Sequence, residues 1–410
     1  MKFLPIIYLM YMFFSIYFLS LFFVLYFNNK KNLFNFPEMK KKYSISVVIP
    51  AYNEGGTIKD TIEHVFAVDY DKIIQVIVVN DCSTDNTKEV VESLQKKYPE
   101  LILINNEKNL GNAGKSKNEG LKYATGELVA FVDADSYPAK DSFKKMIGFF
   151  DDEKVGAVTC PILVRNANNF LEKLQEIEYK MIAFSRKLLG YVDAIYVTPG
   201  PLAIYRKTAL DEVRGFDNDN LTEDIEITWH LTAKGWNREM SLSTEVTTTA
   251  PATLKEWYKQ RRRWSIGGVQ CIAKYKKDFF KRGMLGMFVL PFFVVQFFLG
   301  LLGLGVFFYI TSTTLISNYL LVNYSLPAGV PILTIDSFFI TPNFLDYIGI
   351  ILFIVGTIFT LFSLSMMKGT VFKKDNIFYI LFFSIVYLSI YPFIAISGVY
   401  NYFKGGNKWR

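Results

Sequence analysis

The sequence predicts an α/β domain with a doubly wound, mostly parallel sheet, attached to an α-helical transmembrane region. Two observations lead to this fold class. Between residues 43 and 250, short β-branched runs alternate with amphipathic stretches, which is the pattern of strand–helix–strand units. Outside that block the chain contains long segments without charge, as expected of helices that cross a bilayer.

Four short apolar runs predict buried strands, each bounded by turn residues. They are SISVVIP (44–50), QVIVVN (75–80), LILIN (101–105) and LVAFVDAD (128–135). The stretch GTIKDTIEHVFAV between the first two has the apolar period of a helix. Because ligands of such sheets bind beyond the carboxyl ends of the strands, the polar residues that follow these runs are candidate site residues.

Several apolar segments are long enough to cross a bilayer, which takes roughly 20 residues. Residues 3–27 carry no charge and lack the short core and cleavage site of a signal peptide, so we expect an uncleaved anchor over residues 1–28. A C-terminal transmembrane region, residues 284–400, contains three further candidates: 284–310, 344–366 and 377–399. The proline-containing stretch 315–340 leaves three or four spans open there, before a basic tail, residues 401–410.

The net charge of +7 is placed unevenly, and its placement predicts the orientation of the chain. Residues 28–42 carry five lysines and one glutamate, residues 255–282 carry ten Lys/Arg and two acids, and residues 311–343 carry no Lys or Arg. By the positive-inside rule, we expect a multi-pass protein of the cell membrane whose soluble block faces the cytoplasm. Basic residues on both flanks of segment 377–399 leave the side of the C-terminus open.

The composition excludes several classes of site. Cys82, Cys160 and Cys271 are far apart in sequence and the chain has two histidines, so neither a zinc site nor thiol catalysis is expected. Free thiols are typical of a reducing cytosol. Because the basic residues cluster beside the apolar segments, they favour anionic lipid or a phosphorylated substrate, and no nucleic-acid partner is expected.

Acidic side chains follow three of the predicted strands. Asp133 and Asp135 are one residue apart at the end of an apolar run, so both carboxylates can reach one point. An isolated pair would more often be a solvated turn, but beside other acidic strand ends it favours a divalent cation, and oxygen ligands suit Mg²⁺ or Mn²⁺. Glu54 and Asp81 follow the first two strands and could bind a nucleobase or ribose, or alternatively cap the next helices.

The stretch NDNLTEDIEITWHL (218–231) predicts the start of a helix, with Thr222 as its N-cap and Glu223 and Asp224 in the first turn. The helix dipole alone explains one of these acids. If the start of the helix also faces the pocket, Asp224 could take a proton from an attacking hydroxyl.

The stretch QRRRW (260–264) lies in residues 251–283, which we expect to form amphipathic interface helices. One helical turn could present Gln260 and Arg263 together, and an arginine fork binds phosphate oxygens bidentately. The indole of Trp264 offers a flat face to a sugar ring. The two intervening arginines could do no more than anchor the chain to lipid headgroups.

In their order and spacing, five motifs resemble the processive, membrane-embedded family 2 glycosyltransferases, which include the cellulose, hyaluronan and poly-N-acetylglucosamine synthases. The motifs are IPAYNE (49–54), VVNDCSTDNT (78–87), FVDAD (131–135), TED (222–224) and QRRRW (260–264). The layout of one N-terminal anchor and a C-terminal apolar cluster is most similar to the bacterial poly-N-acetylglucosamine synthases. The resemblance implies a GT-A-like glycosyltransferase domain over residues 43–250.

The resemblance also implies a role for individual residues of this sequence. The nucleotide would be bound by Tyr52, Glu54, Asp81 and Asp133, the metal by Asp135, and the diphosphate by Gln260 and Arg263. Asp224 would be the general base, and the acceptor would be bound by Trp264, Gly200 and Glu223.

The implied activity is inverting transfer of a hexose or N-acetylhexosamine from a UDP-sugar donor to a growing polysaccharide, its carbohydrate acceptor, at the cytoplasmic face of the lipid bilayer. The resemblance also implies Mg²⁺ or Mn²⁺ as cofactor, and coupling to secretion, for which a homo-oligomer or an accessory membrane subunit could complete the path. Two alternatives stay open. One is transfer of a single sugar to a polyprenyl phosphate or lipid, and the other is a non-catalytic nucleotide-sugar-binding scaffold.

Two departures from the family pattern leave roles open. Cys82 stands where the family commonly has glycine. The stretch NLGNAGKSKNEG (109–120) is lysine-rich and one residue longer than the usual stretch, so the roles of Lys115 and Asn118 stay undetermined, as does the donor sugar.

Overall fold

The central sheet of the soluble domain is built from the runs that the sequence marks as strands. The computed structural model describes residues 4–325, 327–328, 344–367 and 374–405. The strands of this sheet are β1 (Ile45–Ala51), β2 (Ile73–Asn80), β3 (Leu101–Asn105), β4 (Leu128–Phe131), β6 (Val155–Thr159), β8 (Ala203–Arg206) and β9 (Asn237–Met240). Their order is β3-β2-β1-β4-β8-β6-β9, and only β8 runs antiparallel to its neighbours. The predicted mostly parallel sheet is confirmed.

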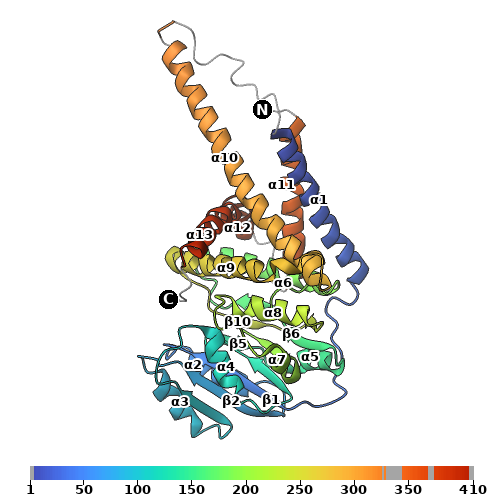
Figure 1. The fold of residues 1–410 in the computed structure, drawn as a ribbon, viewed down its shortest axis with the longest axis vertical. Helices are drawn as coiled ribbons and strands as arrows, with labels where there is room; N and C mark the ends of the chain where they lie inside the picture. Colours follow the sequence, from blue (N-terminus) through green and yellow to red (C-terminus); the bar gives the residue numbers. More distant parts are fainter. Residues whose placement is uncertain (1–3, 326, 329–343, 368–373, 406–410) are drawn as a thin grey trace.

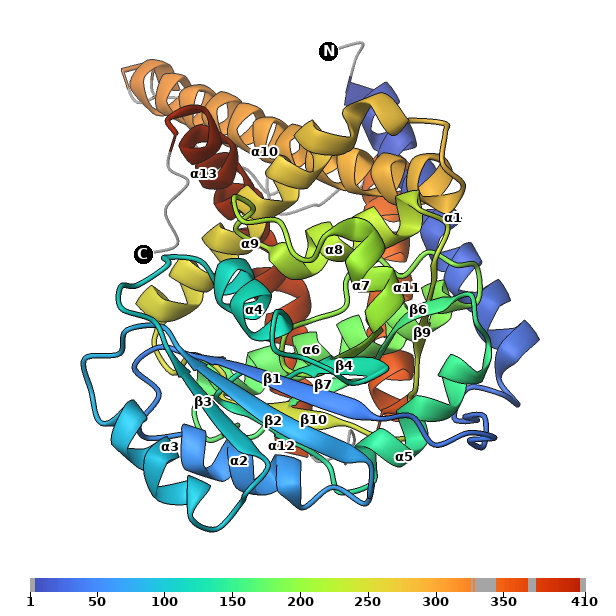
Figure 2. The same cartoon turned by 60° about the horizontal axis from the view of Figure 1, so that its bottom comes forward.

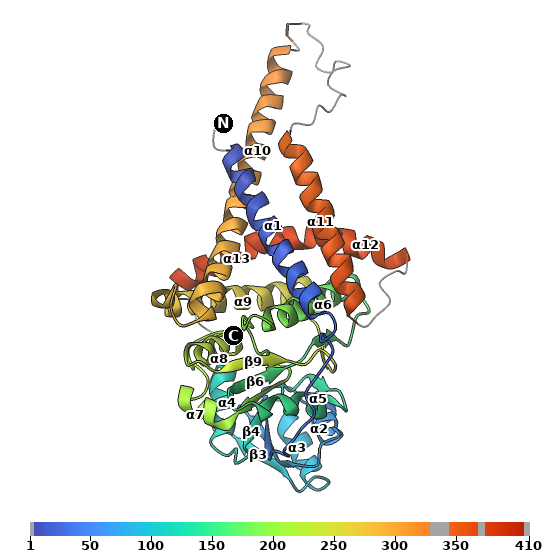
Figure 3. The ribbon, with the colours of Figure 1, turned by 90° about the vertical axis from the view of Figure 1, so that its right-hand side faces the viewer.

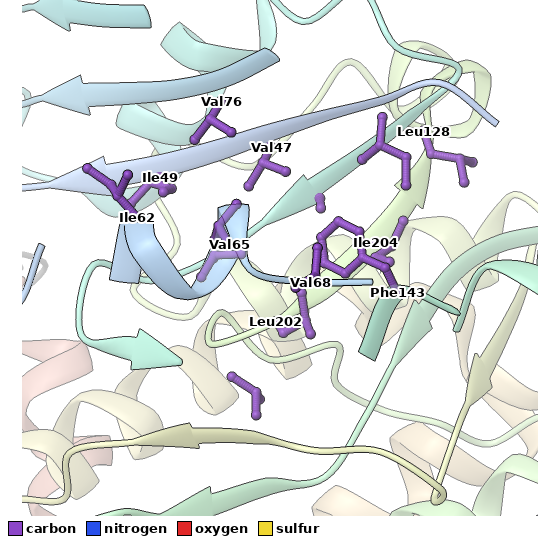
Figure 4. Close-up of a cluster of buried hydrophobic side chains, with 14 of the residues drawn as sticks. Val47, Ile49, Ile62, Val65, Val68, Val76, Leu128, Phe143, Leu202 and Ile204 are labelled. Atoms are coloured by element: carbon purple, nitrogen blue, oxygen red, sulfur yellow. The ribbon is translucent and has the colours of Figure 1, made fainter. Parts of the chain in front are cut away.

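Helices cover both faces of this sheet, as expected of a doubly wound fold (Figure 2). One face carries α2 (Ile58–Phe66), α3 (Thr87–Gln95) and α5 (Ser142–Ile147), and the other carries α4 (Ala113–Leu121), α7 (Lys207–Val213) and α8 (Glu223–Ala233). Figure 4 shows the core between α2 and the sheet, where Ile62 and Val65 face Val47 and Val76. The apolar period of this helix therefore predicts its buried face correctly.

The strand β4 is shorter than predicted. It ends at Phe131 rather than at Asp135, so Asp133 and Asp135 lie in the turn that follows it. The hydroxyl of Thr61 on α2 donates a hydrogen bond to the carbonyl oxygen of Ala134 at 2.8 Å, which fixes this turn. The chain then enters a second sheet, whose strands are β5 (Ser136–Pro138), β10 (Val246–Thr248) and β7 (Ile162–Val164).

Three long apolar helices rise from the soluble domain (Figure 1). They are α1 (Leu4–Asn29), α10 (Leu290–Ser325) and α11 (Phe344–Met366). The apolar helix Leu285–Tyr324 has 40 residues, which is about 60 Å at 1.5 Å per residue and twice the thickness of a bilayer core. The helix continues past the predicted end of segment 284–310, because residues 311–326 contain no proline, glycine or charge that would end it. Most of the stretch between α10 and α11, and with it part of the possible fourth span, falls on residues outside the described ones.

The third predicted C-terminal span is arranged differently. Residues 377–403 are apolar and long enough to cross a membrane. They nevertheless run crosswise to α1, α10 and α11, near the ends of these helices that adjoin the soluble domain (Figure 3). This transverse segment, residues 374–403, consists of α12 (Lys374–Phe382), short irregular helical turns and α13 (Tyr391–Phe403). It packs on α6 (Phe170–Gly190) and α9 (Leu254–Tyr275), which lie between it and the sheet.

A buried ion pair fastens the transverse segment to the soluble domain. Arg261 of α9 is 1% exposed, and its guanidinium pairs with Glu178 of α6 at 2.5 Å. Tyr387 and Tyr391 of the transverse segment both donate hydrogen bonds to the Glu178 carboxylate. The indole of Trp257 donates a hydrogen bond to the Tyr387 hydroxyl at 2.7 Å. Arg261 is therefore an internal contact, and the expectation that it only anchors lipid headgroups is wrong.

Arg261→Ala is expected to lower the free energy of unfolding by about 3–5 kcal/mol, because Glu178 would stay in a buried place without its charged partner. Thermal unfolding of the purified protein in detergent measures this loss.

The double variant Arg261→Met/Glu178→Met serves as the control. It removes both charges, and it is expected to recover part of the loss, since apolar replacement of a buried pair is often close to neutral. A double variant no more stable than Arg261→Ala would contradict the role of the pair.

Candidate functional site

One cavity of about 1470 Å³ lies between the carboxyl edge of the sheet and the helices α4, α6, α8 and α9. Every residue that the sequence analysis placed in the site lines it: Tyr52, Glu54, Asp81, Asp133, Asp135, Gly200, Glu223, Asp224, Gln260, Arg263 and Trp264. The parallel pairing of β1 with β2 and β4 explains the first group, because the carboxyl ends of these strands share one edge. The remaining residues come from α8, α9 and the loop before β8.

Asp81 and Glu54 follow β2 and β1 and organise the loops at this edge. The carboxylate of Asp81 accepts hydrogen bonds from the side-chain amide of Asn106 at 2.8 Å and from the backbone N–H of Leu110 at 3.0 Å. The alternative that Asp81 caps α3 is wrong, because another residue holds that position. The carboxylate of Glu54 accepts a hydrogen bond from the Thr57 hydroxyl at 2.9 Å, so it does support the start of α2.

Asp133 and Asp135 lie close to further negative charge. Burial raises the pKa of Asp133 to about 6, with a contribution from Asp135 and against the positive charge of Lys117. Burial and then the charge of Glu54 raise the pKa of Asp135. The described residues contain no group of three or more His, Cys, Asp or Glu side chains that could hold a metal. A site with so few protein ligands suits Mg²⁺ or Mn²⁺, which take further oxygens from substrate phosphates and water.

Asp224 lies in the first turn of α8, next to Glu223. Thr222 is the N-cap as predicted, but its hydroxyl bonds to the preceding loop and not to the helix backbone. Burial and the charge of Glu223 raise the pKa of Asp224 to about 6, while Lys117 and Arg263 limit the rise. A carboxyl group that titrates near pH 6 is ionised at neutral pH and can accept a proton.

The sequence analysis missed Lys117, which is 1% exposed. Its ammonium lies 2.7 Å from the Glu223 carboxylate and 4.0 Å from that of Asp133. Burial opposes its charge, but Glu223 and Asp133 outweigh burial and raise the pKa of Lys117. The sequence contained one indication that Lys117 is buried. Gly114 and Gly120 lie one turn on either side of Lys117 and are both buried, so a residue between them shares the inner face of α4.

The residues whose roles the sequence left open have different surroundings. Asn118 exchanges two hydrogen bonds of 2.8 Å with the backbone of Phe216, so it braces the loop before α8. Lys115 lines the cavity. Cys82 has a φ of 59°, in the left-handed region that favours glycine, so the turn keeps the conformation that a glycine would adopt.

The QRRRW motif works as one unit on α9. Arg263 and Trp264 line the cavity, and Arg263 donates a hydrogen bond to the carbonyl oxygen of Leu221 at 3.2 Å. The guanidinium of Arg261 lies 4.0 Å from the centre of the Trp264 ring, and it donates a hydrogen bond to the Gln260 side chain. One face of the indole is therefore covered by Arg261, which contacts both Gln260 and Trp264 of the motif.

Gly200 lies against the carboxylate of Asp133. A Cβ at this position would come within 2.5 Å of Asp133 Oδ2 and 2.7 Å of Oδ1. Only glycine allows the backbone to approach this carboxylate so closely.

Gly200→Ala is expected to displace the Asp133 carboxylate and to weaken UDP binding by about tenfold, which corresponds to about 1.4 kcal/mol. Calorimetric titration with UDP measures the change. Gly56→Ala is the matched control, because a Cβ at Gly56 meets nothing within 4 Å. Unchanged UDP affinity in a folded Gly200→Ala variant would show that Asp133 does not act on the nucleotide.

Comparison with known sequences gives one family and named relatives. Residues 46–214 match Glycosyl transferase family 2. The chain is 33% identical over 254 residues to poly-beta-1,6-N-acetyl-D-glucosamine synthase of Staphylococcus aureus, and this match spans 62% of this chain and 60% of the relative's length. It is 30% identical over 287 residues to the synthase of the same name from Staphylococcus epidermidis, spanning 68% of this chain and 69% of the relative.

Comparison with solved structures supports the fold. A mannosyltransferase from Pyrobaculum calidifontis, solved in complex with GDP-Man and Mn²⁺, matches 94% of this chain and 95% of its own with a TM-score of 0.59. The sequence identity is 18%, so this likeness concerns the fold alone.

Proposed function

The chain belongs to glycosyltransferase family 2, and from this premise we propose that it transfers a sugar from a UDP-linked donor to a growing polysaccharide at the cytoplasmic face of the cell membrane. One observation carries the proposal. A single cavity is lined by the acidic residues that follow the strands, by Asp224, whose pKa is raised to about 6, and by the cationic side chain of Arg263. These are the parts that transfer from a nucleotide diphosphate requires. The Staphylococcus relatives favour N-acetylglucosamine as the donor sugar.

In the proposed reaction, Asp224 accepts the proton of an acceptor hydroxyl. The hydroxyl oxygen bonds to the anomeric carbon from the face opposite the diphosphate, and UDP leaves with the electron pair of the broken bond, so the configuration inverts. Negative charge grows on the β-phosphate as this bond breaks. The guanidinium of Arg263, which is held at the wall of the cavity, stabilises this charge as it develops.

We infer a divalent cation, Mg²⁺ or Mn²⁺, bound by Asp135 and the donor diphosphate with Asp133 nearby. The raised pKa values of both carboxyl groups support this inference, because burial and neighbouring acids disfavour the ionised carboxylates and a cation would offset this. The cation would supply a fixed positive charge beside the leaving phosphate. The mannosyltransferase of the same fold holds Mn²⁺ together with its nucleotide sugar.

The membrane arrangement follows from the transverse segment. Lys374 begins α12 and Lys404 follows α13. Because the transverse segment packs on α6 and α9, we infer that both of its ends face the side of the soluble domain. We therefore propose a cytoplasmic C-terminus, with α1, α10 and α11 as the spans. This removes the conflict between the positive-inside rule and a third C-terminal span. Secretion of the product would then need further helices, from a second copy or an accessory membrane subunit.

Two other functions make different demands on the site. Transfer of one sugar to a polyprenyl phosphate or lipid uses the same donor half of the cavity, so only the length of the product separates it from polymer synthesis. A non-catalytic scaffold would have no need of an acid that titrates near pH 6 at the start of α8. The position of Asp224 favours an enzyme.

Asp224→Asn is expected to lower sugar transfer by about 10²–10⁴-fold, the usual contribution of a general base, and to leave UDP affinity within a few fold. Release of UDP from a panel of UDP-sugars and the length of the product on a gel measure the activity. Asp211→Asn, on the exposed face of α7, is the control. A large loss of UDP affinity in Asp224→Asn would contradict the role of base, and UDP release that persists with a chelator would exclude the proposed cation.

The rate of transfer is expected to fall as the pH drops below about 6, because the base acts only when ionised and the pKa of Asp224 is about 6. Above that value the rate should level off. A pH profile of UDP release at saturating donor and constant metal concentration measures this fall in rate. UDP affinity over the same range reports the contribution of Asp133, whose pKa is also about 6. A rate that stays constant from pH 7 to pH 5 would contradict the assignment.

A further inference from the structure

A second cavity, of about 510 Å³, lies between the chain that leaves α1, the end of α6 and strand β9. Asn32 and Asn35 line it from the first of these segments, Lys187 and Tyr191 from the second, and Glu239 from the third. No described residue lines both this cavity and the cavity of the proposed reaction. The polar side chains of this second cavity therefore need an explanation of their own.

Two of these side chains have unused hydrogen-bonding capacity. Lys187 is 5% exposed. Among the described residues, its ammonium donates one hydrogen bond, of 2.8 Å, to the carbonyl oxygen of Met240, although an ammonium has three N–H groups. The buried hydroxyl of Tyr191 has no hydrogen-bond partner in the part of the chain that the structure describes. Because polar groups are costly to bury without partners, this pair of donors indicates an anionic ligand.

The cavity also contains an acid that does not pair with this lysine. Glu239 lines it from β9, and its charge acts on Lys187, yet the described residues contain no ion pair between the two. Burial lowers the pKa of Lys187 and raises the pKa of Glu239, so neither charge fully offsets the cost of burying the other. The neighbouring Arg238 pairs with Asp193 at 3.1 Å. Two opposite charges that share a cavity without contact suit a ligand that carries both an anion and a cation.

The position of the cavity relative to the membrane indicates the source of that ligand. The candidate span α1 has 26 residues, which is about 39 Å at 1.5 Å per residue, compared with about 30 Å for the hydrocarbon core of a bilayer. The last turn of α1 therefore reaches the headgroup layer, and Asn32 lies just beyond its final residue, Asn29. Leu33 belongs to a buried cluster with Phe184 and Leu188 of α6, so the cavity is held beside this end of α1 (Figure 3). Its charged groups thus lie close to the depth of lipid headgroups.

We propose that this second cavity binds the headgroup of a phospholipid that carries a primary amine. The phosphate accepts hydrogen bonds from Lys187 and the Tyr191 hydroxyl, the ammonium donates to the carboxylate of Glu239, and the acyl chains enter the bilayer beside α1. The bound lipid joins the chain after α1 to the end of α6 and so stabilises the attachment of the anchor to the soluble domain. The inference does not rest on the proposed glycosyl transfer, because neither the donor nor the acceptor takes part in it.

The test uses the full-length protein in detergent micelles, titrated with phosphatidylethanolamine, phosphatidylcholine or phosphatidylglycerol that carry the same acyl chains. Native mass spectrometry measures the bound lipid, and thermal unfolding measures the stabilisation. Phosphatidylethanolamine is expected to bind about tenfold more tightly than phosphatidylcholine, whose amine has no N–H, and than phosphatidylglycerol, which has no cation. It is also expected to raise the unfolding temperature more than either. Equal affinity for the three lipids would overturn the proposal, because binding would then not depend on the headgroup.

Two variants separate the charges of the headgroup. Glu239→Gln is expected to remove the preference for phosphatidylethanolamine over phosphatidylglycerol, whereas Lys187→Gln is expected to weaken the binding of both lipids about tenfold. Lys180→Gln is the matched control, because Lys180 is on the same helix, pairs with Glu176 and lines neither cavity. If Lys187→Gln does not fold, Glu239→Gln decides the question. A folded Glu239→Gln variant that keeps the full preference for phosphatidylethanolamine would overturn the proposal.

A soluble headgroup tests whether the ligand is a lipid. Glycerophosphoethanolamine has the same phosphate and amine without acyl chains, and it is expected not to displace phosphatidylethanolamine at equal concentration. If it does displace the lipid, the cavity binds a soluble zwitterion and the lipid part of the proposal is wrong. All of these measurements are made without a UDP-sugar. A failure of the lipid proposal would therefore leave the proposed glycosyl transfer standing, and a failure to turn over any UDP-sugar would leave the lipid result unchanged.

Discussion

The site depends on a balance of charge between acidic and basic side chains at the wall of the cavity. Glu223 and Asp224 are consecutive, and burial, together with the charge of Glu223, raises the pKa of both Asp133 and Asp224. Lys117 and Arg263 offset part of this charge, which keeps the pKa of Glu223 low while that of Asp224 rises to about 6. Two adjacent carboxyl groups thereby differ in protonation behaviour. This difference allows Glu223 to stay paired with Lys117 while Asp224 is free to exchange a proton.

The same helix that carries the QRRRW motif joins the catalytic cavity to the membrane part. Arg261 contacts the Trp264 ring and pairs with Glu178, and Glu178 in turn accepts hydrogen bonds from Tyr387 and Tyr391 of the transverse segment. Glu178 and Tyr391 also line the cavity. A shift of the transverse segment would therefore reach Trp264 through a chain of direct contacts. The first arginine of the run, Arg261, therefore connects the cavity to the transverse segment.

The sequence predicts the sheet and its acidic edge well, and it predicts the helical contacts poorly. Asp81, Asp133 and Asp135 follow apolar runs, and parallel pairing of neighbouring strands is enough to gather them. Lys117 has no such signal apart from two glycines, because a lysine in a lysine-rich stretch resembles a solvated side chain until its acid partner is known. The transverse segment could not be told from a span, because composition and length are the same for a helix that crosses a bilayer and one that packs on α6 and α9.

The two halves of the cavity set different requirements on the substrates. The half at the sheet edge is rich in charge and suits a nucleotide diphosphate with a cation, while the half beside α1 and α10 includes the aromatic side chains of Phe22, Phe292 and Phe293. Three rising helices offer few side chains with which to enclose a polar chain, so secretion of a polysaccharide would need further helices, from a second copy or an accessory membrane subunit.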